Sequence, residues 1–141
     1  MLDDRDLQII DMLEKNARVA FTAIAKAIKV SESTVRKRVG ELEKEGIIKG
    51  YSVVLDPKKL GFNTVALVGL DTAPDKFLEV AKKIAEFDEI KSLSTSTGDH
   101  MIMAEIWIKD NSTLTDFIEN KVSNMGGVTR VCPAIISHTL K

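Results

Sequence analysis

The sequence predicts an α+β protein in two parts, a winged-type helix-turn-helix followed by a ferredoxin-like β-α-β-β-α-β sandwich. Two observations predict this fold. Apolar residues recur at helical spacing through the first third of the chain. Farther along, short apolar runs rich in β-branched residues alternate with two further helical patterns. We therefore expect a helix-turn-helix domain at residues 1–50, a hinge strand and linker at 51–62, and a ferredoxin-like domain at 63–141.

The first fifty residues contain three helical patterns. The first runs from Asp3 to about Lys15. The second is a short pattern formed by Phe21, Ile24, Ala25 and Ile28. The third begins at Ser31, whose hydroxyl can accept a backbone N–H of the first turn, and it ends at Gly46. Its buried stripe is formed by Val35, Val39 and Leu42. The short connection before Ser31 predicts a helix-turn-helix.

The remaining elements follow in the order of a ferredoxin-like unit. A hinge strand is expected in "IIKGYSVVL", before the turn at Asp56-Pro57. Four further strands are expected in "NTVALVGLD", in "EIKSLSTSTGDH" and "MIMAEIWIK" around a Gly-Asp turn, and in "VTRVCPAIIS". One helix should start at Pro74, and another should be capped by Asn111 or Ser112. The resulting order is β-α-β-β-α-β.

The strand "MIMAEIWI" is apolar on both faces. One face carries Ile102, Ala104, Ile106 and Ile108. The other carries Met101, Met103, Glu105 and Trp107. Helices on one side of an antiparallel sheet cover only one face, and a face exposed to water should be polar. We therefore expect a second sheet to cover the other face, which predicts a homodimer through the C-terminal half.

Composition indicates a cytoplasmic protein that is not an enzyme. The 141 residues include 20 Lys and Arg against 21 Asp and Glu, with no apparent signal peptide and no long apolar run. A single cysteine, Cys132, suits a reducing compartment. Two histidines and no paired nucleophile and base argue against catalysis. Because Met101 and Met103 beside His100 are more typical of packing than of metal binding, we expect no metal and no cofactor.

Positive charge is concentrated at the start of the third helix. Residues 26–40 carry five cations against one carboxylate, in a chain that is nearly neutral overall. With the apolar stripe facing inward, Ser33 and Lys37 point outward, Thr34 and Arg36 flank them, and Arg38 leans toward the core edge. Hydroxyls and cations near the helix N-terminus suit base edges and phosphates in a major groove. We expect these five residues to contact DNA. An ordinary solvated amphipathic helix is the alternative.

The block "SESTVRKRVGELEKEGIIKGY", with the helices before it and the β-α-β-β-α-β pattern after it, resembles the Lrp/AsnC (feast/famine) regulators, especially their archaeal branch. The resemblance covers nearly the whole chain. It implies a sequence-specific transcriptional regulator of operator or promoter DNA. It also implies a dimer with back-to-back sheets that often assembles into tetramers or octamers. A sensor or assembly protein whose helix-turn-helix docks on protein is the alternative from another class.

The same resemblance implies a small effector, commonly an amino acid, beside the loop between the two central strands. That loop is "TSTGDHM" here, and its candidate effector ligands are Thr95, Thr97, Gly98, Asp99 and His100. The family pattern continues with an aromatic residue and a second Asp after Gly-Asp. This chain has His100 and Met101 instead, so one carboxylate is missing. An ordinary hairpin turn is the alternative interpretation.

Overall fold

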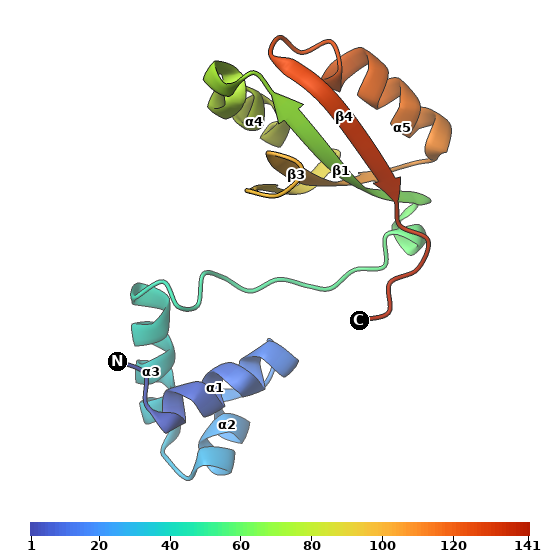
Figure 1. The fold of residues 1–141 in the computed structure, drawn as a ribbon. Helices are drawn as coiled ribbons and strands as arrows, with labels where there is room; N and C mark the ends of the chain where they lie inside the picture. Colours follow the sequence, from blue (N-terminus) through green and yellow to red (C-terminus); the bar gives the residue numbers. More distant parts are fainter. The chain divides into compact units, whose positions relative to one another are not determined.

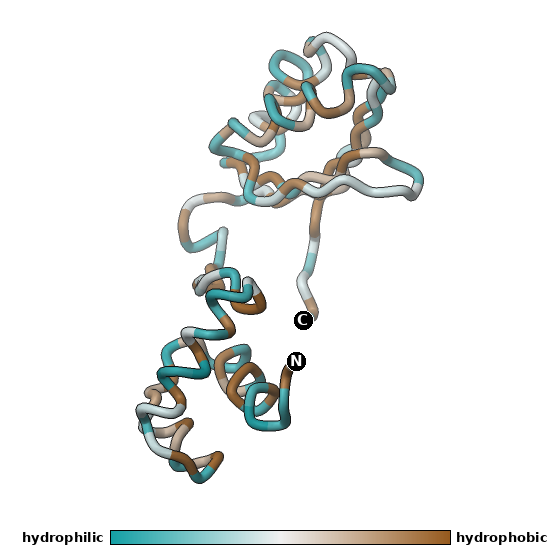
Figure 2. Tube along the Cα trace, turned by 90° about the vertical axis from the view of Figure 1, so that its left-hand side faces the viewer, coloured by the Kyte–Doolittle hydropathy of each residue, from teal (hydrophilic) through white to brown (hydrophobic).

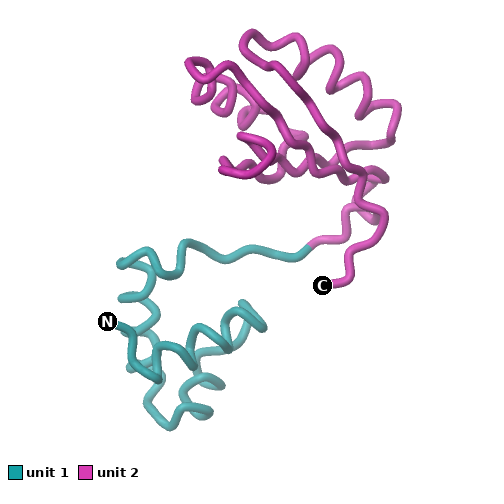
Figure 3. The backbone as a smooth tube through the Cα atoms, in the orientation of Figure 1, with its two compact units in different colours: residues 1–54 teal, residues 55–141 magenta.

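The computed structural model describes all 141 residues and divides into two compact units, Met1–Val54 and Leu55–Lys141 (Figure 3). The division falls inside the segment 51–62 that the sequence predicts as a linker. Each unit has a hydrophobic core of its own.

Unit 1 consists of the three predicted helices, α1 (Asp4–Lys15), α2 (Phe21–Ile28) and α3 (Glu32–Lys44) (Figure 1). Asp3 caps α1 by accepting the N–H of Asp6, and Ser31 caps α3 by accepting the N–H of Thr34. The helices enclose a core of seven buried residues, Ile9, Leu13, Ile24, Ala25, Val35, Val39 and Leu42. The predicted buried stripe of α3 is confirmed.

Helix α3 ends at a glycine. The hinge strand predicted after it is wrong, because the structure has no strand there. Gly46 has a φ of 71°, a left-handed conformation that glycine adopts without strain. The N–H of Ile47 then bonds the carbonyl of Leu42 at 2.9 Å and closes the helix end. Between this turn and Pro57 the backbone joins no sheet, because no strand of the chain pairs with it. Val53 and Val54 are consequently exposed.

Unit 2 has the predicted β-α-β-β-α-β order. Its four strands are β1 (Thr64–Thr72), β2 (Ile90–Thr95), β3 (Ile102–Ile108) and β4 (Val128–Ile135). Its helices are α4 (Phe77–Ala85) and α5 (Asn111–Phe117), with a π-helical turn at Ile118–Val122 and 3-10 turns at Lys58–Leu60 and Pro74–Lys76. The strands pair antiparallel in the spatial order β2-β3-β1-β4. This topology is the ferredoxin-like one.

Helices α4 and α5 cover one face of this sheet, and their apolar sides form the second core with it (Figure 1). The helices alternate between hydrophilic and hydrophobic residues along the chain, as Figure 2 shows, because only one side of each helix is buried. In β3, Ile102, Ala104, Ile106 and Ile108 are buried against the helices. The predicted division of β3 into two faces is therefore confirmed.

The other sheet face has no helix over it, and we call it the open face. It carries the alternate residues of β3, Met101, Met103, Glu105 and Trp107, which are half-buried in the single chain. On β1 its central residue is Leu67, which stands opposite Glu105 of β3 and Ala134 of β4 and is 41% exposed. A largely apolar face of this kind is unusual for a surface in contact with water.

Candidate nucleic-acid interface

The N-terminal half of α3 presents hydroxyls and cations on one exposed surface, which we call the α3 surface: Ser33, Thr34, Arg36 and Lys37. Ser33 is exposed and Thr34 is half-buried. The capping hydroxyl of Ser31 lies 3.0 Å from the Ser33 hydroxyl and 2.8 Å from that of Thr34. The cap therefore orders both hydroxyls at the positive end of the helix, where an anion is favoured.

Arg36 is exposed but is held by two neighbours. Its Nη2 donates to Glu32 Oε1 at 2.8 Å, one turn earlier in α3. Its guanidinium also lies 5.4 Å from the centre of the Phe21 ring, which belongs to α2. The side chain thus leaves the helix in one direction, between a carboxylate and an aromatic face.

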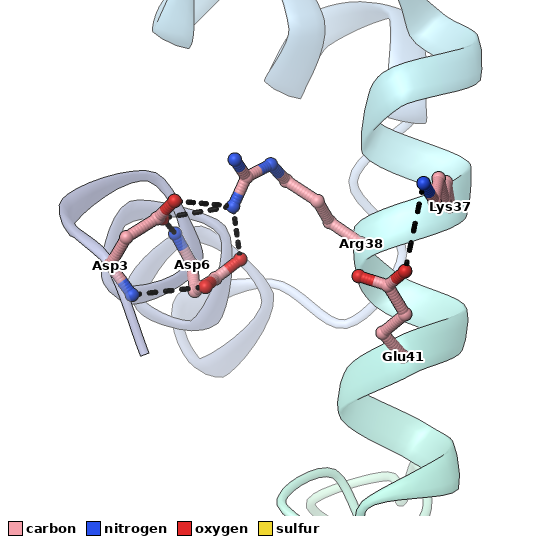
Figure 4. Close-up of polar contacts among 5 residues, drawn as sticks. All are labelled: Asp3, Asp6, Lys37, Arg38 and Glu41. Atoms are coloured by element: carbon pink, nitrogen blue, oxygen red, sulfur yellow. Dashed lines mark hydrogen bonds and ion pairs between the residues drawn. The ribbon is translucent and has the colours of Figure 1, made fainter. Parts of the chain in front are cut away.

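Lys37 projects most freely. Its side chain is 79% exposed, and its Nζ lies 3.9 Å from Glu41 Oε1 (Figure 4). An exposed ion pair at this distance contributes little to stability, so Lys37 can readily exchange Glu41 for another anion. Lys37 can therefore reach a phosphate at small cost.

Arg38 differs from its neighbours because its guanidinium is already bound. Nη1 donates to Asp3 at 2.8 and 2.9 Å and to Asp6 at 2.7 Å, so that α3 is tied to the start of α1 (Figure 4). The side chain is only 22% exposed. The hydrogen bonds that Arg38 donates to Asp6 and Asp3 raise the pKa of Arg38, while the hydrogen bonds that Asp3 accepts from the Asp6 backbone N–H and from Arg38 lower the pKa of Asp3. Asp3 and Asp6 were missed by the sequence reasoning, although their capping-box spacing marks them.

This contact predicts an acid sensitivity of unit 1. Because the folded-state pKa of Asp3 lies below the unfolded one, its charge stabilises the fold above the unfolded pKa of about 3.9. That contribution is lost as the pH falls through the lower, folded pKa. We expect the melting temperature of unit 1 to decrease at pH values below about 4. The decrease should be less steep in Asp3→Asn, which lacks the titrating carboxylate but still caps the helix. Circular dichroism melts between pH 2 and pH 7 measure this dependence.

The matched control is Asp4→Asn, which removes an exposed carboxylate from the same turn of α1. It should leave the acid-side slope close to that of the wild type. Equal slopes in wild type and Asp3→Asn would contradict the role given to Asp3.

The predicted effector residues lie in the hairpin between β2 and β3, but they do not all point the same way. Thr95 ends β2, and Thr97, Gly98 and Asp99 form an exposed tip. His100 instead turns back onto the open face and is only 15% exposed. The structure therefore brings three of the five residues together at the tip, leaves Thr95 at the end of the strand and directs His100 toward the sheet.

His100 is held by residues that the sequence reasoning missed. Its Nδ1 lies 3.1 Å from Asp71 Oδ2, and the N–H of Met101 donates to Asp71 Oδ1 at 3.2 Å. The imidazole occupies the space over Gly69, where an added Cβ would clash with the ring. Burial raises the pKa of Asp71, but the hydrogen bonds from His100 and Met101 outweigh it and leave that pKa below its ordinary value. Asp71 thereby anchors the hairpin to β1.

A hollow of about 480 Å³ lies at the end of the open face away from this hairpin. Trp107, Glu105 and Val65 of the sheet line it, together with Pro57 before β1 and His138 after β4. The structure gathers no group of three His, Cys, Asp or Glu side chains suited to a metal ion. None of its helices is both long and apolar enough to span a bilayer.

The fold and the α3 surface define a two-domain DNA-binding transcriptional regulator, and comparisons with known proteins identify its family. Residues 2–49 match the family model described as winged helix-turn-helix DNA-binding, and residues 65–141 match the Lrp/AsnC ligand binding domain. The chain is 53% identical over 141 residues to the HTH-type transcriptional regulator LrpA of Pyrococcus abyssi, and the match covers all of both chains. The chain belongs to the Lrp/AsnC family. It is a transcriptional regulator and not an enzyme.

Solved structures share the fold over the whole chain. LrpC of Bacillus subtilis superposes with a TM-score of 0.87 at 26% identity, covering 100% of this chain and 98% of that one. A Neisseria meningitidis transcriptional regulator in complex with L-Met superposes with a TM-score of 0.92 at 21% identity, covering 100% and 93%. The family assignment favours the DNA-binding regulator over the alternative in which the helix-turn-helix docks on protein.

Proposed function

We propose that the chain works in the cytoplasm as a homodimer that places two α3 helices in successive major grooves of operator or promoter DNA. The observation that carries this proposal is the α3 surface, where two hydroxyls and two cations project beside a helix N-terminus. Such residues pair with base edges and phosphates, and two-fold dimers read half-sites about one helical turn apart.

Each residue of the α3 surface has a role suited to its chemistry. Arg36 reads a base, because a planar guanidinium can pair bidentately with guanine. Ser33 and Thr34 contact base edges or sugar-phosphate, and Lys37 meets a phosphate as a mobile point charge. Arg38 was predicted to contact DNA, but its guanidinium already pairs with the carboxylates of Asp3 and Asp6. We therefore assign it the role of holding α3 against α1.

The open face supports the dimer. Its half-buried Met and Trp side chains and its exposed Leu67 are apolar groups that a second copy of the sheet would remove from water. Stacking two open faces back to back leaves α4 and α5 outside, where further contacts would build tetramers or octamers. Equilibrium sedimentation at micromolar concentration tests the dimer, and a monomer would contradict it.

A small effector such as an amino acid is proposed to act at the exposed hairpin between β2 and β3. Thr97, Gly98 and Asp99 form its tip, Thr95 ends the strand before it, and His100 lies behind it. Asp99 is 86% exposed and offers a carboxylate to an ammonium group. Support comes from the match to a ligand binding domain and from the L-Met held by the Neisseria regulator. Calorimetric titration with the twenty amino acids tests the site. No heat and no change in DNA affinity would leave the hairpin as an ordinary turn.

DNA binding by this dimer should depend strongly on salt. If each subunit neutralises about three phosphates, the dimer neutralises about six, and log affinity against log salt should have a slope of about −5. Retardation of a fragment from the protein's own promoter at several salt concentrations measures this slope.

Lys37→Ala should weaken binding to all DNA sequences alike and reduce the slope by about one for each subunit.

The control for Lys37 is Lys82→Ala, which removes an exposed cation from α4 in unit 2. Its slope should match that of the wild type. A wild-type slope near zero would contradict phosphate binding altogether.

A further inference from the structure

We propose that Phe21 and Glu32 determine sequence specificity without touching DNA, by holding the guanidinium of Arg36 in the direction of a base edge. The inference rests on the proposed function, because it requires that Arg36 face the duplex. It adds two positioning residues, one of which lies on α2 and outside the recognition helix.

The two contacts come from different parts of the fold. Glu32 lies one turn before Arg36 on α3 and accepts a 2.8 Å hydrogen bond from Nη2. Phe21 is the first residue of α2, and its ring lies 5.4 Å from the Arg36 Cζ. Phe21 is half-buried and packs against the core of unit 1, so the fold fixes this ring under the guanidinium.

A single exposed ion pair would be weak support for a positioning role. Here a carboxylate and an aromatic face restrain the same planar group from two sides. Restraint matters because an arginine side chain loses substantial rotamer entropy when it binds, and a guanidinium already aligned loses less. Lys37 has no such support, since its only ion-pair partner lies 3.9 Å away.

Glu32 also acts on the unspecific part of the attraction. Its charge offsets that of Arg36, so the pair is attracted less strongly to the phosphate backbone, whatever the DNA sequence. On a correct site, Arg36 adds a bidentate contact with a base to its hydrogen bond with Glu32, because only one of its five N–H groups donates to that carboxylate. On an incorrect site it gains only a phosphate. Both neighbours thus favour discrimination over raw affinity.

The test is a comparison of affinities for two DNA fragments. An operator is selected from randomised DNA with the wild-type full chain, and Arg36→Ala identifies the base pair at which discrimination is lost. Phe21→Leu keeps an apolar side chain but removes the aromatic face, and it should reduce discrimination at that base pair about two- to five-fold while unspecific affinity stays within about two-fold. Glu32→Gln should reduce it similarly and raise unspecific affinity about two- to five-fold.

Phe21→Tyr keeps the ring and is the control, and it should restore the wild-type ratio. Melting curves of each variant separate lost discrimination from lost folding. If Arg36→Ala abolishes discrimination while Phe21→Leu and Glu32→Gln keep the wild-type ratio, the inference is overturned and the proposed function stands. If wild-type binding to DNA shows no dependence on salt, the proposed function fails together with the inference.

Discussion

A chain in which lysine replaces Leu67 is expected to be monomeric at micromolar concentration and to bind its operator at least about 100-fold more weakly. Leu67 lies at the centre of the open face, 41% exposed in the single chain. In a dimer of stacked sheets the new ammonium group of each copy would be removed from water, a desolvation cost of several kcal/mol that an ion pair with Glu105 repays only in part. Because a monomer offers one α3 helix, the gain from a second, linked half-site is lost.

The single chain should tolerate this substitution. Leu67 stands opposite Glu105 in the sheet, and a lysine there can form a cross-strand ion pair. The control is Leu78→Lys, which places the same charge on an exposed leucine of α4, away from the open face. Sedimentation and DNA retardation should show a dimer with full affinity for the control. A dimeric Leu67→Lys chain would contradict the proposed use of the open face.

Local sequence patterns predicted most of the fold because the elements are locally determined. Helix α3 begins at a serine cap and ends at a glycine in a left-handed conformation, and both signals are visible in the sequence. The alternation along β3 predicted which side chains face α4 and α5, because successive residues of a strand point to opposite faces. The periodicity of α3 likewise separated its buried stripe from its exposed cations.

What the sequence did not predict depends on contacts between distant residues. The predicted hinge strand does not form, because a strand needs a pairing partner and the chain provides none for this segment. Arg38 was placed correctly at the core edge, but its carboxylate partner Asp3 lies 35 residues away in sequence. The turn of His100 onto Asp71 depends on the empty space over Gly69, which only the paired strands reveal.

Replacing Ile24 with alanine is expected to unfold unit 1 selectively. Ile24 is completely buried, and the core that it belongs to has only seven buried residues. Deleting so much buried side chain costs about 2–5 kcal/mol. A unit of this size has a total stability of about 3–8 kcal/mol. The variant should therefore be largely unfolded at temperatures at which unit 1 of the wild type is still folded. DNA binding should be lost in proportion.

Unit 2 should survive this change, because its core is separate and contains none of the same residues. Trp107, the only tryptophan, reports on unit 2 by fluorescence, while circular dichroism follows all the helices. Ile24→Val is the matched control, since losing one methyl group should cost about 0.5–1.5 kcal/mol and leave unit 1 folded. Loss of the Trp107 signal at the same temperature as the helical signal would contradict independent cores. Retention of the dimer by a chain that no longer binds DNA would instead assign assembly to unit 2 and recognition to unit 1.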